Sequence, residues 1–412
     1  MSNRFAITLA LLCALPGSLL RFAHIELGTV ADTSLFGLSI VASAFLLAWA
    51  AEASEVEIAQ GLAVAFIALI AVLPEYAVDM TFAWKAGTDP EFAPYAVANM
   101  TGGNRLLIGA AWPLIFFLFW WKTRERVLRL ERGHTVEIVA LSIATLYSFT
   151  LPFKDTITVI DTAILAGLFM GYVWVIARAP SEEPELVGPA KSIGTLPRRQ
   201  RRISIVGLFL IAAGSIFASA EPFAEGLIHS GAQLGIDEFL LVQWLAPFAS
   251  ESPEFLVAGI LAWRGRATVA MGALLSSKVN QWTLLIGGLP VAYGLSSGDL
   301  GGLPLDMRQK EEIFLTAAQS FFAVAILISL SLSTKEAVAL AVLFFIQLVI
   351  PIEELRMGIA GVYVALGLWI FFRDRLDLPF LWGTAWGGVK DPRTLADDYE
   401  VEPAPEPAAR AP

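Results

Sequence analysis

Long apolar runs dominate this chain of 412 residues and constrain its fold more than any other feature. A helix needs roughly 20 mostly apolar residues to cross the hydrocarbon core of a bilayer, and about twelve runs meet that requirement. They lie near residues 5–22, 33–51, 59–83, 92–121, 136–153, 157–177, 203–225, 237–262, 267–296, 312–331, 335–352 and 357–373. Charged residues make up only 16% of the chain, against about 25% in an ordinary soluble domain. The sequence therefore predicts an all-α integral membrane protein.

The distribution of basic residues supports this count and orients the chain. With about twelve crossings, both termini and alternate loops share one side of the membrane. That side carries 20 of the 28 Lys and Arg residues and the other side carries six, while Arg105 and Lys278 fall inside spans. Short cytoplasmic loops are the ones enriched in Lys and Arg. We therefore expect both termini in the cytoplasm, and we expect the cell (plasma) membrane as the location.

Two polar segments divide the chain. Residues 178–202 form a Pro-containing linker between two apolar halves, 1–177 and 203–375. Residues 376–412 end in a stretch of Pro, Ala and acidic residues that cannot bury a core, so we expect a disordered cytoplasmic tail. Arg21 follows the first run without a small-residue cleavage site, so we interpret that run as a span rather than a signal peptide.

An internal repeat links the two halves. The segment from Pro74-Glu75 to Trp84 is matched 179 residues later by Pro253-Glu254 to Trp263, with identical Pro, Glu, Val, Ala and Trp residues. The copies lie in the third and eighth runs, an odd number of crossings apart, so they cross the membrane in opposite directions. Inverted repeats with interrupted helices are typical of secondary transporters, whose ion sites lie near the midplane. We place the two repeats at residues 33–121 and 203–296.

Acidic side chains inside the runs are the candidate ligands. An ionised carboxylate in the bilayer costs several kcal/mol unless it is paired, hydrated or bound to a cation. Glu75 and Glu254 each follow a proline that interrupts the helical hydrogen bonds, which directs carbonyl groups and a carboxylate to one cavity. Asp79 lies one turn after Glu75, and Glu251 lies one turn before Glu254. The alternative is that some of these acids only pair with intramembrane bases.

Other function classes find little support in the sequence. The single cysteine, Cys13, excludes an intramolecular disulfide and a thiolate metal centre, and the three histidines are scattered. The motifs of nucleophilic and metal-dependent enzymes are missing, so we expect no enzyme activity and no resident cofactor. A net charge of −10 argues against nucleic-acid binding. The partners that we expect are inorganic cations and the lipid bilayer.

The motif regions resemble the α-repeats of the sodium/calcium exchanger superfamily, the calcium:cation antiporters. The family motif reads G-T-S-L-P-E on one helix and G-S-N-x-x-N/D on the next. The first half has Ile70-Ala71-Val72-Leu73-Pro74-Glu75 and then Gly102-Gly103-Asn104. The second half has Ala249-Ser250-Glu251-Ser252-Pro253-Glu254 and then Ser276-Ser277-Lys278, with Gln281 three residues further on. The chain is therefore similar to a divergent member of this superfamily.

The resemblance implies a cation site built from both repeats, in which Glu75 and Glu254 ligate Ca²⁺. The first half departs from the motif, because Ala71, Val72 and Gly103 lack the side-chain oxygens that the family has there. The metal ligands that we expect are Glu75, Glu254, Glu251, Ser250, Ser277, Gln281 and Asn104, with Lys278, Asp79 and Arg105 as coupling residues.

We expect a secondary antiporter that exchanges Ca²⁺, or another cation, for Na⁺ or H⁺ by alternating access. Lys278 occupies an Asn position of the family and would repel a cation, so we hypothesise that it loses a proton when the cation enters. The alternative is that Lys278 only neutralises Glu251. Two other functions stay open at this point: a monovalent cation/proton antiporter, and a membrane protein that keeps the fold without transport.

Overall fold

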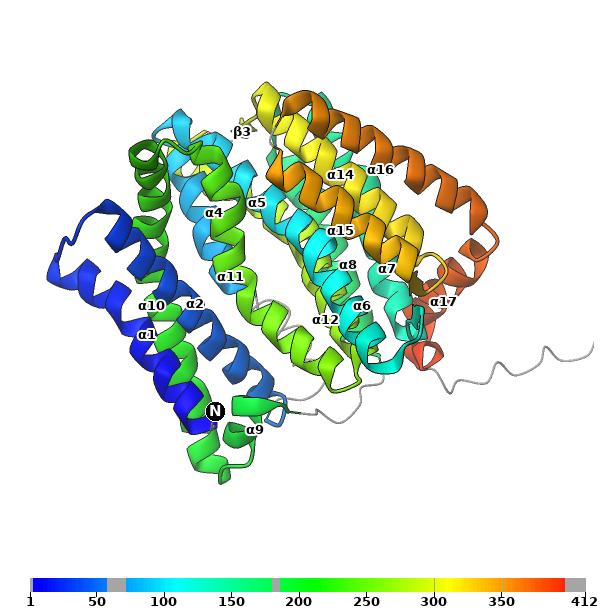
Figure 1. The fold of residues 1–412 in the computed structure, drawn as a ribbon, viewed down its shortest axis with the longest axis horizontal. Helices are drawn as coiled ribbons and strands as arrows, with labels where there is room; N and C mark the ends of the chain where they lie inside the picture. Colours follow the sequence, from blue (N-terminus) through cyan, green and yellow to red (C-terminus); the bar gives the residue numbers. More distant parts are fainter. Residues whose placement is uncertain (1–2, 58–71, 180–185, 300, 351, 397–412) are drawn as a thin grey trace, which may run out of the picture.

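The structure is a computed structural model, and it describes residues 3–57, 72–179, 186–299, 301–350 and 352–396. Helices account for nearly all of this chain (Figure 1). Those of the first half are α1 (Asn3–Ala23), α2 (Thr29–Ser54), α4 (Leu73–Ala86), α5 (Ala93–Leu106), α6 (Trp112–Thr123), α7 (Thr135–Ser148) and α8 (Val159–Ile176). A π-helical turn, η2 (Leu107–Ala111), joins α5 to α6, and 3₁₀ turns lie at η1 (Pro90–Phe92), η3 (Arg132–His134) and η4 (Leu151–Phe153).

The second half is also built from helices. Its helices are α9 (Gly188–Gly194), α10 (Arg198–Leu234), α11 (Glu238–Trp263), α12 (Ala267–Asn280), α13 (Ile286–Ser297), α14 (Met307–Leu327), α15 (Thr334–Val349), α16 (Glu353–Arg373) and α17 (Leu378–Lys390). A second π-helical turn, η5 (Gln281–Leu285), joins α12 to α13, and a 3₁₀ turn, η6 (Pro392–Leu395), follows α17. Such π turns inside α-helices are frequent at functional sites. Both repeats carry one, directly after the second motif region.

The all-α membrane fold is confirmed, and every predicted apolar run contains helix. Seven helical segments of the described chain are long and apolar enough to cross a membrane, so the count of twelve crossings stays a prediction. The third run, 59–83, is described only from its α4 part onward; the rest lies outside the described residues.

The segment after residue 376 differs from the expected disordered tail. Its first part forms α17, because Leu381, Ala385 and Gly388 recur at helical spacing and bury one face against α7. The opposite face of α17 exposes Trp382 and Trp386. Residues 397–412 lie outside the described part of the chain.

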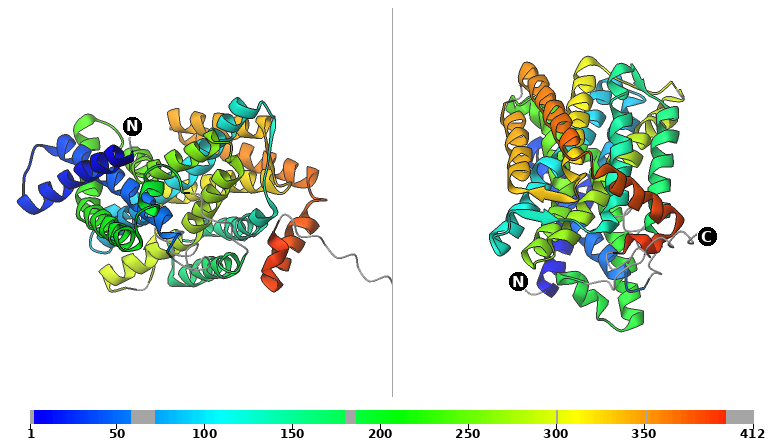
Figure 2. Two further views of the ribbon diagram at one scale, coloured as in Figure 1. Left: turned by 90° about the horizontal axis from the view of Figure 1, so that it is seen from below. Right: turned by 90° about the vertical axis from the view of Figure 1, so that its right-hand side faces the viewer.

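The connections between helices gather on two faces of the molecule. One face, which we call the terminal face, carries the start of α1, the loop around α9 and α17, and lies at the bottom of Figure 1. There β1 (Val127–Arg129) pairs antiparallel with β4 (Ser331–Ser333). On the opposite face β2 (Thr156–Ile157) pairs antiparallel with β3 (Leu303–Pro304). Figure 2 shows α1, α2 and α10 together at one edge of the molecule and α16 and α17 at the other.

Helix starts at these faces follow from local sequence. Capping boxes begin α8 (Thr158 with Asp161), α14 (Asp306 with Gln309) and α15 (Ser333 with Glu336). In each box the side chain before the helix accepts from a backbone N–H group of the first turn, and the second side chain returns to the cap. These polar residues satisfy groups that a helix end leaves unpaired, which places the ends at the two polar faces.

The two repeats run in opposite directions through the molecule. The end of α4 reaches the opposite face, where Gly87 lies against Ser296 and Ser297. The matching end of α11 reaches the terminal face, where the Trp263 carbonyl accepts a hydrogen bond from Lys122 at 3.0 Å. Equivalent helices of the two repeats also have equivalent neighbours. Helix α4 contacts α5 of its own repeat and α13 of the other, and α11 contacts α12 of its own repeat and α6 of the other. This arrangement is the inverted repeat that the sequence predicts.

Candidate cation site

Prolines shape the two helices that carry the motif glutamates. Pro74 lies in the first turn of α4, so Glu75 is at the start of that helix. Pro253 lies inside α11 and has no N–H group to give to the Ala249 carbonyl. The hydroxyl of Ser252 donates to that carbonyl instead, at 3.1 Å. Pro253 therefore interrupts the main-chain hydrogen bonding of its helix just before Glu254, whereas Pro74 lies at the start of its helix.

Two carboxylates from opposite repeats converge on Gly103 of α5. A Cβ atom added at Gly103 would lie 2.5 Å from Oε1 of Glu251 and 2.9 Å from Oε1 of Glu75. The sum of these distances is the upper limit for the separation of the two oxygens. Both side chains are only 2% exposed. Because Gly103 has no side chain, the carboxylates of Glu75 on α4 and Glu251 on α11 can both approach the same point.

The oxygens at this point are poorly satisfied. Among the described residues, neither carboxylate oxygen of Glu75 nor Oε2 of Glu251 has a hydrogen-bond partner. Oε1 of Glu251 accepts from Nε2 of Gln281 at 3.3 Å, and Gln281 lies in the π turn η5. A buried carboxylate in this condition is costly unless it is protonated or binds a cation.

Lys278 lies beside the carboxylates but is held by the first repeat. Its Nζ donates to Oδ1 of Asn104 at 2.6 Å and to the Asn104 carbonyl at 3.3 Å, and it lies 4.3 Å from the ring of Trp282. Asn104 and Lys278 are the equivalent positions of the two motifs. The ammonium group therefore joins the repeats through an amide, and its charge acts on Glu75 and Glu251 from there.

Asp79 and Tyr76 complete the α4 side of the site. Asp79 is fully buried, and its Oδ1 accepts from Nδ2 of Asn99 on α5 at 2.7 Å. Tyr76 donates its hydroxyl to Oδ1 of Asn280 at 2.7 Å. The partner of Asp79 among the described residues is thus an amide rather than an intramembrane base. Tyr76 was not a candidate in the sequence, because an aromatic residue after Pro-Glu reads equally well as core.

Glu254 occupies the next turn of α11. The residue as a whole is partly exposed, whereas Glu75 and Glu251 are buried, but the Oε2 atom of Glu254 is also buried and without a hydrogen-bond partner among the described residues. It lies near Ser277, the motif serine of α12. The hydroxyl of Ser250 donates to the carbonyls of Ala246 and Pro247 at 3.2 Å each, which leaves its lone pairs for a cation. The structure therefore places Glu254 and Ser277 beside the Glu75–Glu251 pair, not between those carboxylates.

Arg105 points away from this site. Its guanidinium forms an ion pair with Glu312 of α14 at 2.5 Å and lies 4.9 Å from the ring of Trp244. Within the described ranges, no three His, Cys, Asp or Glu side chains form a ready-made metal cluster. A cation at Gly103 would be bound by two carboxylates together with amide and hydroxyl oxygens, the ligands that hard cations prefer.

The fold and the site define a class of protein: a membrane transporter of inverted repeats with a buried acidic site between them. The chain belongs to the sodium/calcium exchanger protein family, whose model matches residues 33–178 and 204–353. These two ranges contain both repeats and both motif regions. No curated protein sequence gives a significant match to this chain.

Solved structures agree with this membership. The crystal structure of the H⁺/Ca²⁺ exchanger CAX is similar at 44% identity and a TM-score of 0.91, over 94% of this chain and 98% of that one. The protein YfkE is similar at 15% identity and a TM-score of 0.61, over 87% of this chain and 99% of that one. The sodium–calcium exchanger NCX_Mj is similar at 15% identity and a TM-score of 0.52, over 78% of this chain and 98% of that one. The last two share the fold.

Proposed function

We propose that this protein is a Ca²⁺/H⁺ antiporter that works by alternating access. Cation antiport follows from the family and from the close structural match to an H⁺/Ca²⁺ exchanger. The observation that carries the finer proposal is the convergence of Glu75 and Glu251 on Gly103, with buried oxygens that no described residue satisfies. The cations are cargo, and no resident cofactor or chemical reaction is involved.

The coupling follows from the cost of buried charge. An empty site with two ionised carboxylates is too costly to move across the bilayer, so the site needs either Ca²⁺ or protons. When Ca²⁺ binds, each carboxylate that coordinates it gives up its proton to the adjoining solution. When Ca²⁺ leaves on the other side, protons return to the carboxylates and the site moves back. Exchange is strict because the two cargoes use the same oxygens.

The charge of Lys278 affects which cation the site prefers. A fixed ammonium group beside the site reduces the net negative charge that a divalent cation meets. This observation favours a monovalent cation/proton antiporter as the second candidate. In the proposed Ca²⁺/H⁺ cycle, Lys278 gives up a proton as the cation enters, with Asn104 holding it beside the pocket.

Transport by purified protein in sealed vesicles tests the proposal. We expect a pH gradient to drive Ca²⁺ uptake and a Na⁺ gradient alone to drive little. Glu75→Gln and Glu254→Gln should each abolish exchange, and so should Glu251→Gln. Glu238→Gln is the matched control, because Glu238 is on α11 as well but lies half-buried in its first turn, at the opposite face. An active Glu75/Glu254 double variant would place the site elsewhere, and uptake of Na⁺ or K⁺ without Ca²⁺ would favour the second candidate.

We also propose that the terminal face is the cytoplasmic one and that the protein resides in the cell membrane. The loops of that face carry most of the Lys and Arg residues of the chain, which favours the cytoplasm. Single cysteines at Arg199 and Asp299, in a Cys13→Ser background, lie on the two faces. In intact cells, a membrane-impermeant thiol reagent should label the Asp299 position and spare the Arg199 position. The reverse pattern would invert the assignment.

A further inference from the structure

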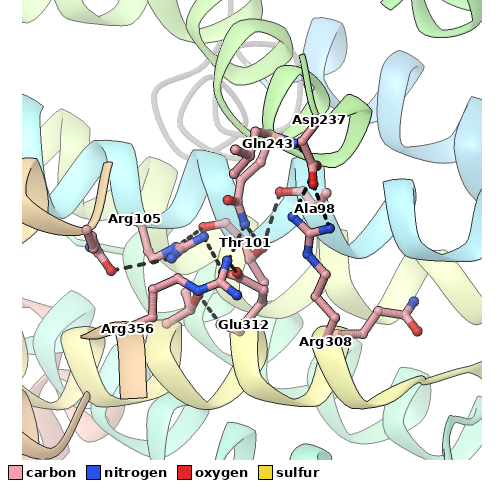
Figure 3. Close-up of polar contacts among 12 residues, drawn as sticks. Ala98, Thr101, Arg105, Asp237, Gln243, Arg308, Glu312 and Arg356 are labelled. Carbon is pink, nitrogen blue, oxygen red and sulfur yellow. Dashed lines mark hydrogen bonds and ion pairs between the residues drawn. The ribbon is translucent and has the colours of Figure 1, made fainter. Parts of the chain in front are cut away.

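A second buried polar cluster lies between the cation site and the opposite face. Its members are Arg105 of α5, Gln243 of α11, Glu312 of α14 and Arg356 of α16, and we call it the Glu312 cluster (Figure 3). We propose that Gln243 is a positioning residue that, through Glu312, keeps the route between α5 and α11 closed toward the opposite face. This inference rests on the proposed antiport, because alternating access requires such a route.

Glu312 is the centre of the cluster. Its carboxylate forms ion pairs with Nη2 of Arg105 at 2.5 Å and with Nη1 of Arg356 at 2.7 Å, and it accepts a hydrogen bond from Nε2 of Gln243 at 2.9 Å. All four side chains are buried. Buried ion pairs are weak contributors to stability, and their best-attested role is to specify one arrangement of the elements they join. Here they join α5, α14 and α16 and, through Gln243 alone, α11.

The contact between α11 and α5 is tightest at Gln243. Pro247, four residues later, has no N–H group for the Gln243 carbonyl, so that carbonyl is left out of the helical hydrogen bonds. Gly102 of α5 packs directly against it, since a Cβ atom added at Gly102 would lie 1.7 Å from the oxygen. The backbones of the two helices therefore meet one residue away from Gly103, where the carboxylates converge.

This contact seals one side of the site. Gln243, Ala246 and Ser250 follow one another along α11 at helical spacing, and all three are buried. Glu254, one turn further toward the terminal face, is partly exposed as a residue, although its Oε2 atom is buried. The described structure is thus closed toward the opposite face. To open there, α11 must separate from α5 at Gly102, and the hydrogen bond from Gln243 to Glu312 must break.

The ion pair of Arg105 has no equivalent at the matching position of the second repeat. Val279 occupies the position of the second repeat that corresponds to Arg105, directly after Lys278 as Arg105 follows Asn104. An apolar residue cannot form an equivalent ion pair. The two openings are therefore controlled by different chemistry, and loss of Gln243 should favour opening toward the opposite face specifically.

The test compares two glutamines of the same neighbourhood. Gln243→Met removes the bond to α11 and leaves both ion pairs of Glu312 intact. Gln347→Met is the matched control: Gln347 is also buried and contacts Arg105 at 3.4 Å, but it lies on α15. The reporter is Ala246→Cys in a Cys13→Ser background, labelled from each side by a membrane-impermeant maleimide. A lost hydrogen bond to a charged acceptor corresponds to about tenfold or more in an equilibrium constant.

We expect labelling from the opposite face to be about tenfold faster or more in Gln243→Met than in the parent, and unchanged in Gln347→Met. In transport, Gln243→Met should lower the KM for Ca²⁺ presented at that face and change kcat in a different proportion. Gly102→Ala should separate α5 from α11 by steric contact and give the same faster labelling. It therefore provides a second test if Gln243→Met fails to fold. The proposal is overturned if Gln243→Met and Gly102→Ala are both labelled from the opposite face at the same rate as the parent. It is also overturned if Gln347→Met accelerates labelling as much as Gln243→Met does. Labelling needs no transport, so an inactive parent with the expected labelling would refute the antiport and leave this inference standing.

Discussion

Replacing Gly103 by serine should weaken cation binding, even though serine is the residue that the exchanger motif has at this position. The added side chain would begin 2.5 Å from Oε1 of Glu251 and 2.9 Å from Oε1 of Glu75, closer than nonbonded atoms pack. Both oxygens are at the ends of flexible side chains, so the helices can stay in place while the carboxylates move apart. Overpacking of this kind typically costs about 1–3 kcal/mol. A bound cation must draw the two carboxylates back toward Gly103, so this cost opposes binding and corresponds to at most roughly 5–150-fold in apparent Ca²⁺ affinity.

The same geometry predicts a compensating partner. Glu251 stands where the family has serine, and its carboxylate occupies the space that the missing side chain of Gly103 leaves. The Gly103→Ser, Glu251→Ser double variant restores the family pattern at both positions. It lacks the Glu251 carboxylate and is not expected to exchange, but in equilibrium Ca²⁺ binding to the purified protein the two changes should show a coupling energy of about 1 kcal/mol or more in a double-mutant cycle. Effects that add within about 0.5 kcal/mol would refute the reasoning, because the two sites would then not share this space.

Three further predictions follow from other parts of the structure. Lys278→Gln should change the pH dependence of Ca²⁺ uptake in vesicles, and an unchanged profile would eliminate Lys278 from proton coupling. Glu312→Gln leaves two buried guanidinium groups uncompensated and should lower the free energy of unfolding by about 3–5 kcal/mol, measured by thermal unfolding in detergent. Burial alone would raise the pKa of Asp237, but hydrogen bonds from Arg308 and the Leu240 backbone bring that pKa below its ordinary value. Its ionised form therefore stabilises the fold above its unfolded pKa of about 4, and this contribution disappears as pH falls through the lowered pKa. Asp237→Asn should cost about 1 kcal/mol or less at pH 7, since the pair is half exposed, and it should unfold like the parent in acid near pH 2.

Hydropathy and the internal repeat were sufficient to predict the helical membrane fold and its inverted halves. Both properties can be inferred from the order of residues alone. The length of an apolar run predicts a membrane crossing, and the number of crossings between two copies of the repeat predicts their relative direction. The convergence of Glu75 and Glu251 could not be predicted in this way. It depends on which residue of α5 lacks a side chain at the point where two distant helices meet.

Arg105 shows a second limit of sequence reasoning. It is one of two basic residues inside the predicted spans, which placed it among the candidate coupling residues. Neighbouring residues on a helix point about 100° apart, so Asn104 faces Lys278 while Arg105 faces Glu312. Gln243 gave no signal at all, because a single buried glutamine in an apolar run has many structural explanations. The helical part of the tail, α17, was missed because its composition was judged together with the acidic stretch that follows.

The two short strand pairs restrict which helices can move against one another. Each pair takes one strand from the first half and one from the second, so main-chain hydrogen bonds tie the halves together at both faces of the molecule. Sliding a paired strand by one residue would reverse the side on which its residues project. The helices attached to these strands, α6 to α8 and α13 to α15, therefore form a frame that keeps its shape. We therefore expect the helices outside this frame to move during a transport cycle. They include α1, α2 and α10, whose ends are not joined by strand pairing in the described chain.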